Sequence, residues 1–285
     1  MRDHANIEPL TTIGLSDYHC HCDYSIDAEG TIDEYCEAAL KRGLAEICFT
    51  THWDTNPING SKDNVIRIGG ENKATVLENL APYVDDVLRA RDQYYARGLW
   101  VALGLEYGWY PNCEESVTAI KERYRFDYLL CGIHELDGLC FSCEGCYPKC
   151  FPHYSLEQLV DKYVGEVASA ASTGLFTCIA HLDYIRKYGE TFYGPKLNDL
   201  LLTRLTTVAF PALQASGTAL EVNTSAIRRR FDDYFPKAAI VNAARRAGVD
   251  VRYLGSDAHA PDQVGYDFDA AVALISPWFE AWCED

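Results

Sequence analysis

The chain has 285 residues, 48% of them hydrophobic, which is enough to form the core of one large or two small domains. Its formal net charge of −17 repels phosphate backbones, so we expect no nucleic-acid partner. No apolar run approaches the ~18 residues of a membrane span, and the N-terminus lacks a signal pattern. We therefore expect a cytoplasmic protein with no membrane partner. In that compartment the 12 cysteines should stay thiols or metal ligands rather than form disulfides.

Candidate strands alternate with candidate helices along the chain. The strands are rich in Val, Ile, Leu, Phe, Tyr or Cys, and we place their ends at His19, Thr51, Glu106, Ile133, Ala180, Asn223 and Ser256. Capping patterns predict helices between them, over 31–43, 155–174 and 237–247. The polar stretch 54–70 predicts a mobile loop at the active site. This α/β alternation predicts a parallel sheet, and its seven units fit a single (β/α)7 barrel domain over 1–285.

Six of the eight histidines, together with several carboxylates, lie at these strand ends. The ends of barrel strands converge at one mouth, so these side chains should meet there. Residues two apart in a strand face the same side, which lets His19 and His21 share one ion. An H-x-H pair alone is a weak indication, and a single His or acid elsewhere is more often a buried or solvated residue. Together they predict a site for divalent metal ions.

The order of these residues resembles the PHP (polymerase and histidinol phosphatase) superfamily. It begins with D-x-H-x-H at 17–21 and continues through T-x-H, G-x-E, G-x-H and a single His to a late S-D-A-H. The segments 181–189, 220–225 and 255–259 look like the PHP-type histidinol-phosphate phosphatases. The resemblance runs from Asp17 to Phe268 and implies a distorted seven-stranded, TIM-like barrel with its active site at the C-terminal ends of the strands.

The resemblance also implies up to three metal ions, which could be zinc, iron or manganese. By motif position, the first ion has the ligands His19, His21, Glu106 and Asp257. Glu106 bridges to a second ion, whose other ligands are His134 and His181. The third ion has the ligands Asp27, His52 and His259. Thr51 departs from the pattern, because many relatives carry Asp there, and Asp54 is the candidate to replace its contact to a ligand.

Two or three ions in one site suit phosphate ester hydrolysis, because they activate water and neutralise phosphoryl oxygens. We expect Glu106, Asp257 and His259 to be the catalytic residues, with His259 or a metal-bound water as the acid. The residues expected to bind the substrate and its phosphate are Arg186, Lys187, Arg228 and Asn223. A helix cap is an equal alternative for Asn223.

The resemblance favours a small phosphorylated metabolite as substrate, L-histidinol phosphate being converted to L-histidinol and phosphate. One alternative is another hydrolase of the PHP or amidohydrolase type, which would act on a different phosphoester, a nucleic-acid end or an amide. A non-catalytic metal-binding sensor is the other alternative.

A run of four cysteines departs from the phosphatase pattern. Cys140, Cys143, Cys146 and Cys150 lie in an insertion loop at about 139–153, on the predicted active-site side. Four thiolates can bind a structural zinc ion, and the spacing also matches the bacterial ferredoxin run that binds an iron–sulfur cluster. Free thiols or an oxidisable loop are the third alternative. Cysteines on predicted strands, such as Cys48 and Cys178, are expected to be core residues.

Overall fold

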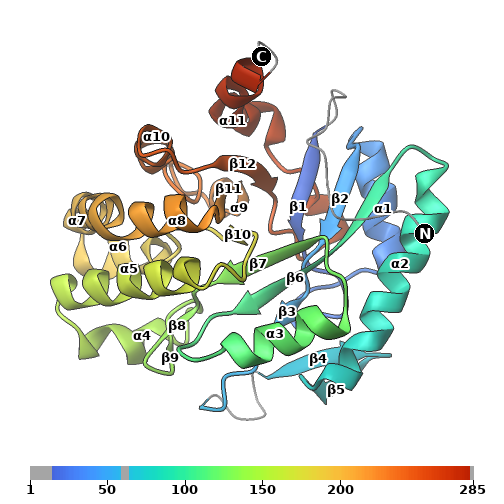
Figure 1. Ribbon diagram of the computed structural model, residues 1–285, viewed down its shortest axis with the longest axis horizontal. Coiled ribbons are helices and arrows are strands. Elements are labelled where there is room, and N and C mark those ends of the chain that lie inside the picture. Colours follow the sequence, from blue (N-terminus) through green and yellow to red (C-terminus); the bar gives the residue numbers. More distant parts are fainter. Residues whose placement is uncertain (1–14, 59–63, 283–285) are drawn as a thin grey trace.

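The computed structural model describes residues 15–58 and 64–282. Seven parallel strands form a nearly closed barrel in the order β1-β2-β6-β7-β10-β11-β12 (Figure 1), which confirms the predicted fold class. The strands are β1 (Ser16–Cys20), β2 (Glu46–Phe49), β6 (Trp100–Gly108), β7 (Tyr128–Gly132), β10 (Cys178–Ile179), β11 (Ala219–Asn223) and β12 (Val251–Gly255). Each observed strand end lies within two residues of the predicted one.

Helices cover the outside of the barrel. The longer ones are α1 (Ile32–Lys41), α2 (Ala81–Tyr95), α3 (Glu114–Arg123), α5 (Leu156–Ser172), α6 (Arg186–Tyr193), α7 (Lys196–Arg204), α8 (Phe210–Ser216), α10 (Ala238–Arg246) and α11 (Phe268–Trp282). Both predicted capping boxes are present, Thr31 with Glu34 at α1 and Ser155 with Gln158 at α5. Among the described residues, no helix combines the length and apolarity needed to cross a membrane.

The stretch 54–70 is not one irregular loop, as the sequence suggested. A short strand β3 (His52–Trp53) pairs with β6, and β4 (Val65–Ile68) pairs with β5 (Glu71–Ala74) in an antiparallel hairpin. Gly69 and Gly70 form its two-residue turn, and both have positive φ, which only glycine adopts without cost. Residues 59–63 of the predicted loop lie outside the described residues.

The interior of the barrel is filled at the N-terminal ends of the strands. Tyr18, Tyr128 and Tyr253 lie in mutual ring contact there, with centroids 4.9 to 5.2 Å apart. Small residues of the other strands complete this cluster, among them Cys48, Ala102, Cys178 and Ala219. Because this end is packed with side chains, the polar residues that follow along the same strands are gathered at the opposite end.

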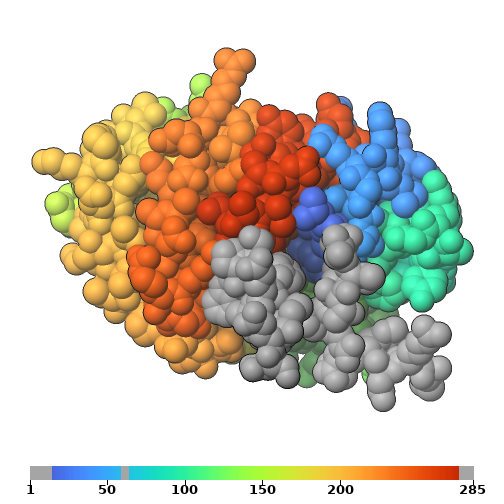
Figure 2. All heavy atoms as spheres, turned by 90° about the horizontal axis from the view of Figure 1, so that it is seen from above, coloured from blue at the N-terminus to red at the C-terminus, as the bar shows by residue number. Residues whose placement is uncertain are grey.

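The barrel closes between its first and last strands, which lie side by side at the two ends of the colour range (Figures 1 and 2). Their one backbone bridge joins Cys20 to Ala258 among the described residues. The buried carboxylate of Asp17 supplies the rest of the closure, because it accepts hydrogen bonds from the backbone N–H groups of Ser256 and Gly265, each at 2.9 Å. At this seam, the junction between β1 and β12, a side chain therefore replaces the backbone hydrogen bonds that join neighbouring strands elsewhere.

We predict that Asp17→Ala lowers the free energy of unfolding by about 3 kcal/mol, because two buried N–H donors lose their acceptor. Urea denaturation of the purified variant measures this. Asp17→Asn keeps one acceptor oxygen and should lose less. A loss below about 1 kcal/mol in the alanine variant would show that the carboxylate does not hold the seam.

Candidate metal centre

Glu106 lies at the centre of the polar cluster. Residues of β6 that share its side of the strand are Ala102 and Gly104, so the strand's alternation points Glu106 into the barrel above the packed interior. One carboxylate oxygen, Oε1, lies 3.2 Å from His181 Nε2 and 3.5 Å from His134 Nε2. The other, Oε2, lies 2.9 Å from His52 Nδ1 and 3.5 Å from both His19 Nε2 and His21 Nε2. A single carboxylate therefore faces two separate groups of imidazoles.

Asp257 also faces His19 and His21. Its Oδ1 lies 3.4 Å from His21 Nε2 and 3.7 Å from His19 Nε2. The two imidazole nitrogens are 3.1 Å apart, so both histidines turn the same ring edge toward one point. Their donor atoms and that of Asp257 are all within 4.8 Å of one another, and all three residues are buried. This is one pocket of nitrogen and oxygen donors.

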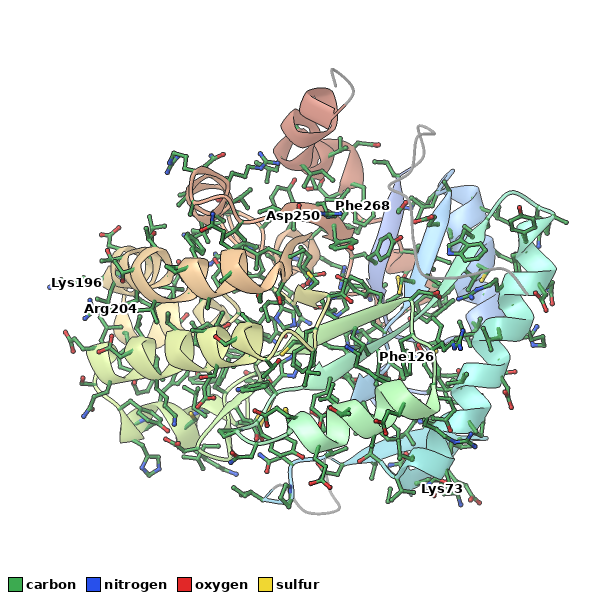
Figure 3. The ribbon with its side chains drawn as sticks, viewed as in Figure 1. Lys73, Phe126, Lys196, Arg204, Asp250 and Phe268 are labelled. Atoms are coloured by element: carbon green, nitrogen blue, oxygen red, sulfur yellow. A yellow bond between two sulfur atoms is a disulfide. The ribbon has the colours of Figure 1, made fainter. Side chains whose placement is uncertain are left out.

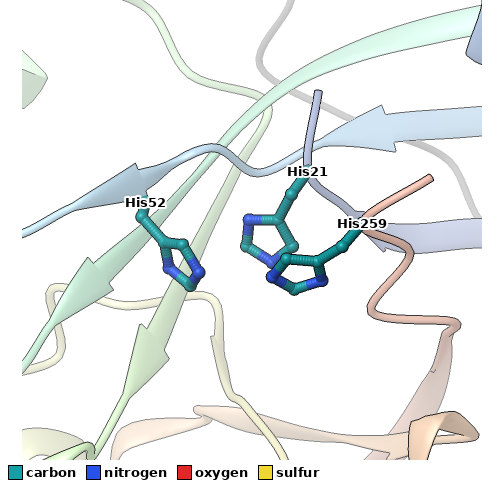
Figure 4. Close-up of side chains that lie close together, drawn as sticks. All are labelled: His21, His52 and His259. Atoms are coloured by element: carbon teal, nitrogen blue, oxygen red, sulfur yellow. The ribbon is translucent and has the colours of Figure 1, made fainter. Parts of the chain in front are cut away.

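A further group lies at the open edge of the cluster. Figure 4 shows the rings of His21, His52 and His259 gathered from three separate parts of the chain. Asp27 Oδ2 lies 3.3 Å from His259 Nε2 and 3.6 Å from His52 Nε2. The side chain of Asp27 is 54% exposed, whereas that of His19 is fully buried. Solvent and ligands therefore reach the cluster from the side of Asp27.

The backbone is strained where it presents two of these side chains. His181 has φ of 29° and Asp257 has φ of 51°, conformations that L-residues rarely adopt. Two glycines make room for the donors: a Cβ on Gly132 would lie 2.4 Å from the His134 ring, and one on Gly255 would lie 2.3 Å from Glu221. Strain and close approach of this kind are typical of sites held in one geometry for function.

The buried atoms and the charges of the cluster suit divalent metal ions. His181 Nδ1 is buried without a hydrogen-bond partner, and Glu106 Oε2 accepts no hydrogen bond of good geometry although His52 Nδ1 lies 2.9 Å away. Burial raises the pKa of Glu106, but the nearby His19 and His52 outweigh this effect. The pKa of Glu106 therefore lies well below its usual range, and the carboxylate is ionised. Burial, with His52 and His259, lowers the pKa of His21 to about 3, so its ring is neutral. Ionised carboxylates and a neutral imidazole with converging lone pairs fit divalent metal ions.

Glu221 supports the cluster, although no role was predicted for this residue. It lies fully buried on β11, and its carboxylate is 3.0 Å from His19 Nδ1 while also accepting the backbone N–H of His181 at 2.9 Å. It thereby fixes which His19 nitrogen faces the other donors. The spacing in the sequence could have indicated this role, because Glu221 stands two residues before Asn223 and so points to the same side of a buried strand.

Hydroxyl groups take the place expected for Asp54. Thr51 Oγ1 lies 2.7 Å from Ser25 Oγ, which lies 3.4 Å from His21 Nδ1 and accepts the backbone N–H of His52. Ser25 and Thr51 are both buried. A serine–threonine pair therefore contacts the ligand ring in place of a carboxylate.

Two of the four expected substrate residues are fully buried and serve the scaffold. Arg186 forms an ion pair with Asp183 at 3.1 Å, donates to the Tyr234 carbonyl and stacks against Phe235. Asn223 donates to Glu221 and accepts the N–H of Ser225, so it orients the carboxylate behind His19. The expectation of direct substrate contact does not agree with these positions, because neither side chain has an exposed face.

The other two expected substrate residues, Arg228 and Lys187, lie at the rim of the donor cluster. Arg228 donates to the carbonyls of Ser256 and Asp257, at 2.9 and 2.8 Å, and so holds the segment that presents Asp257. Lys187 Nζ donates to the Ser142 carbonyl and the Tyr184 hydroxyl, both at 2.7 Å. The Tyr184 ring stacks on His181 with centroids 4.1 Å apart, which places Lys187 beside the donor cluster.

The cysteine loop lies next to the same rim. It begins with a hairpin of β8 (Glu135–Leu136) and β9 (Leu139–Cys140) directly after His134, and continues through a short helix, α4 (Tyr147–Cys150). Cys143 and Cys146 form a disulfide. This corrects the general expectation that the cysteines remain thiols or ligands, and it agrees with the alternative of an oxidisable loop. Cys140, Cys143 and Cys146 form one group of sulfurs, and Cys150 is buried outside it, so four sulfurs do not surround one point as expected.

Comparison with known proteins assigns this fold and cluster to a family. The model of the PHP domain family matches residues 17–225. The chain belongs to the PHP domain family. A probable histidinol-phosphatase of Deinococcus radiodurans is 34% identical over 265 residues, which cover 92% of this chain and 93% of that protein. The histidinol-phosphatase of Bacillus subtilis is 23% identical, with 84% of this chain and 91% of that protein covered.

Solved structures share the PHP fold. A Listeria monocytogenes structure matches with a TM-score of 0.75 and 16% identity, covering 90% of this chain and 99% of that one. The histidinol phosphate phosphatase of Lactococcus lactis, solved with zinc, L-histidinol and phosphate, has a TM-score of 0.67 at 21% identity and covers 93% of both chains. At these sequence identities, the comparison shows that the fold is shared.

We predict that Glu221→Gln weakens metal binding by roughly 10- to 100-fold, because the His19 ring loses its charged partner. Titration of metal-free protein against a chelator of known affinity measures the change. Circular dichroism controls for folding. Unchanged affinity in a folded variant would contradict the role given to Glu221.

Proposed function

We propose that this PHP domain protein is a metal-dependent phosphomonoesterase of the histidinol-phosphatase type, converting L-histidinol phosphate to L-histidinol and phosphate. The observation that carries the proposal is the position of Glu106, whose two oxygens face separate imidazole groups in a site open at one side. Relatives named histidinol-phosphatase that align over most of the chain support the choice of substrate.

Two to three divalent ions, zinc, iron or manganese, complete the proposed site. His19, His21, Asp257 and Glu106 would bind one ion, and His134 and His181 would share Glu106 with a second. Asp27, His52 and His259 would bind the third, at the solvent-exposed edge. Such ions neutralise charge on a phosphoryl group and make water reactive near neutral pH.

The side chains of the site carry negative charge and orient one another. Glu106 and Asp257 hold negative charge among the imidazoles, and Asp257 is fixed by Ser225, whose hydroxyl donates to its Oδ2 at 3.1 Å. The His259 Nδ1 lies 3.0 Å from the Asp257 carbonyl, which directs Nε2 toward Asp27 and the open side. We assign this Nε2 either to the third ion or, when protonated, to the leaving oxygen; one nitrogen cannot do both at once.

Lys187 is the rim cation proposed to contact the phosphate. Burial and the nearby Arg229 lower its pKa to about 8, so the ammonium form predominates at pH 7. Two of its three N–H donors are used by Ser142 and Tyr184, which fix its position and leave one for a ligand. Arg228 and Asn223 act behind it, through the segments that present Asp257 and His19.

We predict that Glu106→Gln and His134→Ala lower turnover of L-histidinol phosphate by more than about 100-fold without loss of the fold. Release of inorganic phosphate from a panel of metabolite monoesters measures turnover, and chelator-treated wild type should be equally inactive. Lys196→Ala is the matched control, since Lys196 is exposed on α7 at the far edge of the molecule (Figure 3). Full activity of the metal-free protein, or cleavage of only amides or oligonucleotides, would contradict the proposal.

Lys187→Met should raise KM for the phosphoester roughly 10-fold or more, because one charge-assisted hydrogen bond is lost. In the wild type, KM should also rise above about pH 8, as the ammonium loses its proton. The variant should not show that rise. Steady-state kinetics from pH 6.5 to 9 test both expectations, and identical pH profiles for the two proteins would remove Lys187 from phosphate binding.

A further inference from the structure

The cysteine loop contains a group of sulfurs that the phosphatase site does not use. The Sγ atoms of Cys140, Cys143 and Cys146 all lie within 4.8 Å of one another, and Cys143 and Cys146 are joined by a disulfide. Cys140 remains a half-buried thiol whose Sγ lies 3.4 Å from Ser142 Oγ. Three sulfurs therefore surround one point, and a single disulfide can use only two of them.

The loop is fixed at its ends and open in its middle. Phe141 and Phe151 are fully buried, and their rings stack with centroids 6.4 Å apart. Between them, Glu144 and Gly145 are exposed, and turn hydrogen bonds run from the N–H groups of Cys146 and Tyr147 to the Cys143 carbonyl. The backbone thus holds the sulfurs close together in the exposed middle of the loop. A bound ion is a known way of stabilising such a segment.

A disulfide alone accounts poorly for this arrangement. The bonded cysteines are only three residues apart, so the bond closes a very short loop and restricts the unfolded chain little. It also leaves the third sulfur unexplained. Lys187, whose ammonium donates to the carbonyl of Ser142 between the cysteines, places a positive charge beside the group.

We propose that the reduced loop is a second metal site, in which Cys140, Cys143 and Cys146 bind one thiophilic divalent ion such as zinc. A dithiol reductant supplies two electrons and two protons, the Cys143–Cys146 bond breaks to give two thiols, and the reductant becomes a disulfide. Each of the three thiols then releases its proton as its sulfur binds the ion. Solvent occupies the fourth tetrahedral position, on the exposed side of the loop.

This site would be chemically distinct from the histidine-and-carboxylate centre, although the two are linked. The N–H of Phe141 donates to the carbonyl of His134 at 3.0 Å, and Lys187 joins Ser142 to the Tyr184 ring that stacks on His181. An ion bound by the loop would therefore stabilise the rim of the phosphatase site without adding a ligand to it.

Cobalt(II) titration of the full-length, reduced protein tests the proposal, with a readout separate from phosphate release. We expect a sulfur-to-cobalt charge-transfer absorption in the wild type, because the ligands of the other centre are nitrogen and oxygen. Cys140→Ser and Cys143→Ser should lose that absorption and contain one zinc ion fewer per chain after reconstitution. Cys140 is half-buried at the end of a strand, so its serine variant should fold.

Cys150→Ala is the matched control, since Cys150 lies on the same loop but outside the sulfur group, and this variant should keep both the absorption and the ion. Absence of the absorption in reduced wild type would overturn the proposal, as would its persistence in Cys140→Ser. Its loss in a folded Cys150→Ala, or purification of the protein with iron and acid-labile sulfide, would also overturn the three-sulfur, single-ion site.

Discussion

The structure depends on one buried carboxylate, that of Glu106, and on the imidazoles that surround it. An ionised carboxylate in a buried position is costly unless opposite charges or hydrogen-bond donors offset it. Here five histidines approach its two oxygens within 3.5 Å. They come from segments that only a closed barrel brings together. The seam at Asp17, the strained backbone at His181 and Asp257, and the support from Glu221 all maintain this arrangement.

The two oxygens of Glu106 face two different groups of imidazoles, and this arrangement suits phosphate chemistry. Under the proposed function, one cation bound by each group could contact the same phosphoryl group. His19 and His21 lie on the buried side of the cluster, whereas Asp27 and His259 lie at its exposed edge.

Much of the fold could be predicted from the sequence, because its signals are local. Thr31 and Ser155 carry their capping partners three residues away, and the apolar runs before each histidine end within two residues of the observed strands. Contacts between distant segments could not be predicted. Glu221 lies 202 residues from His19, and Arg186 looks like a phosphate ligand beside a histidine motif until Phe231 and Phe235 enclose it. Likewise, cysteine spacing gave four candidate ligands, and only the folded loop separates Cys150 from the other three.

We propose that Glu106 joins two cations, and electron paramagnetic resonance of the manganese(II)-loaded protein tests this role most directly. The account predicts the spectrum of a magnetically coupled pair in the wild type, and isolated manganese(II) signals in a folded Glu106→Ala variant. A wild-type spectrum containing only isolated ions at full metal loading would contradict it.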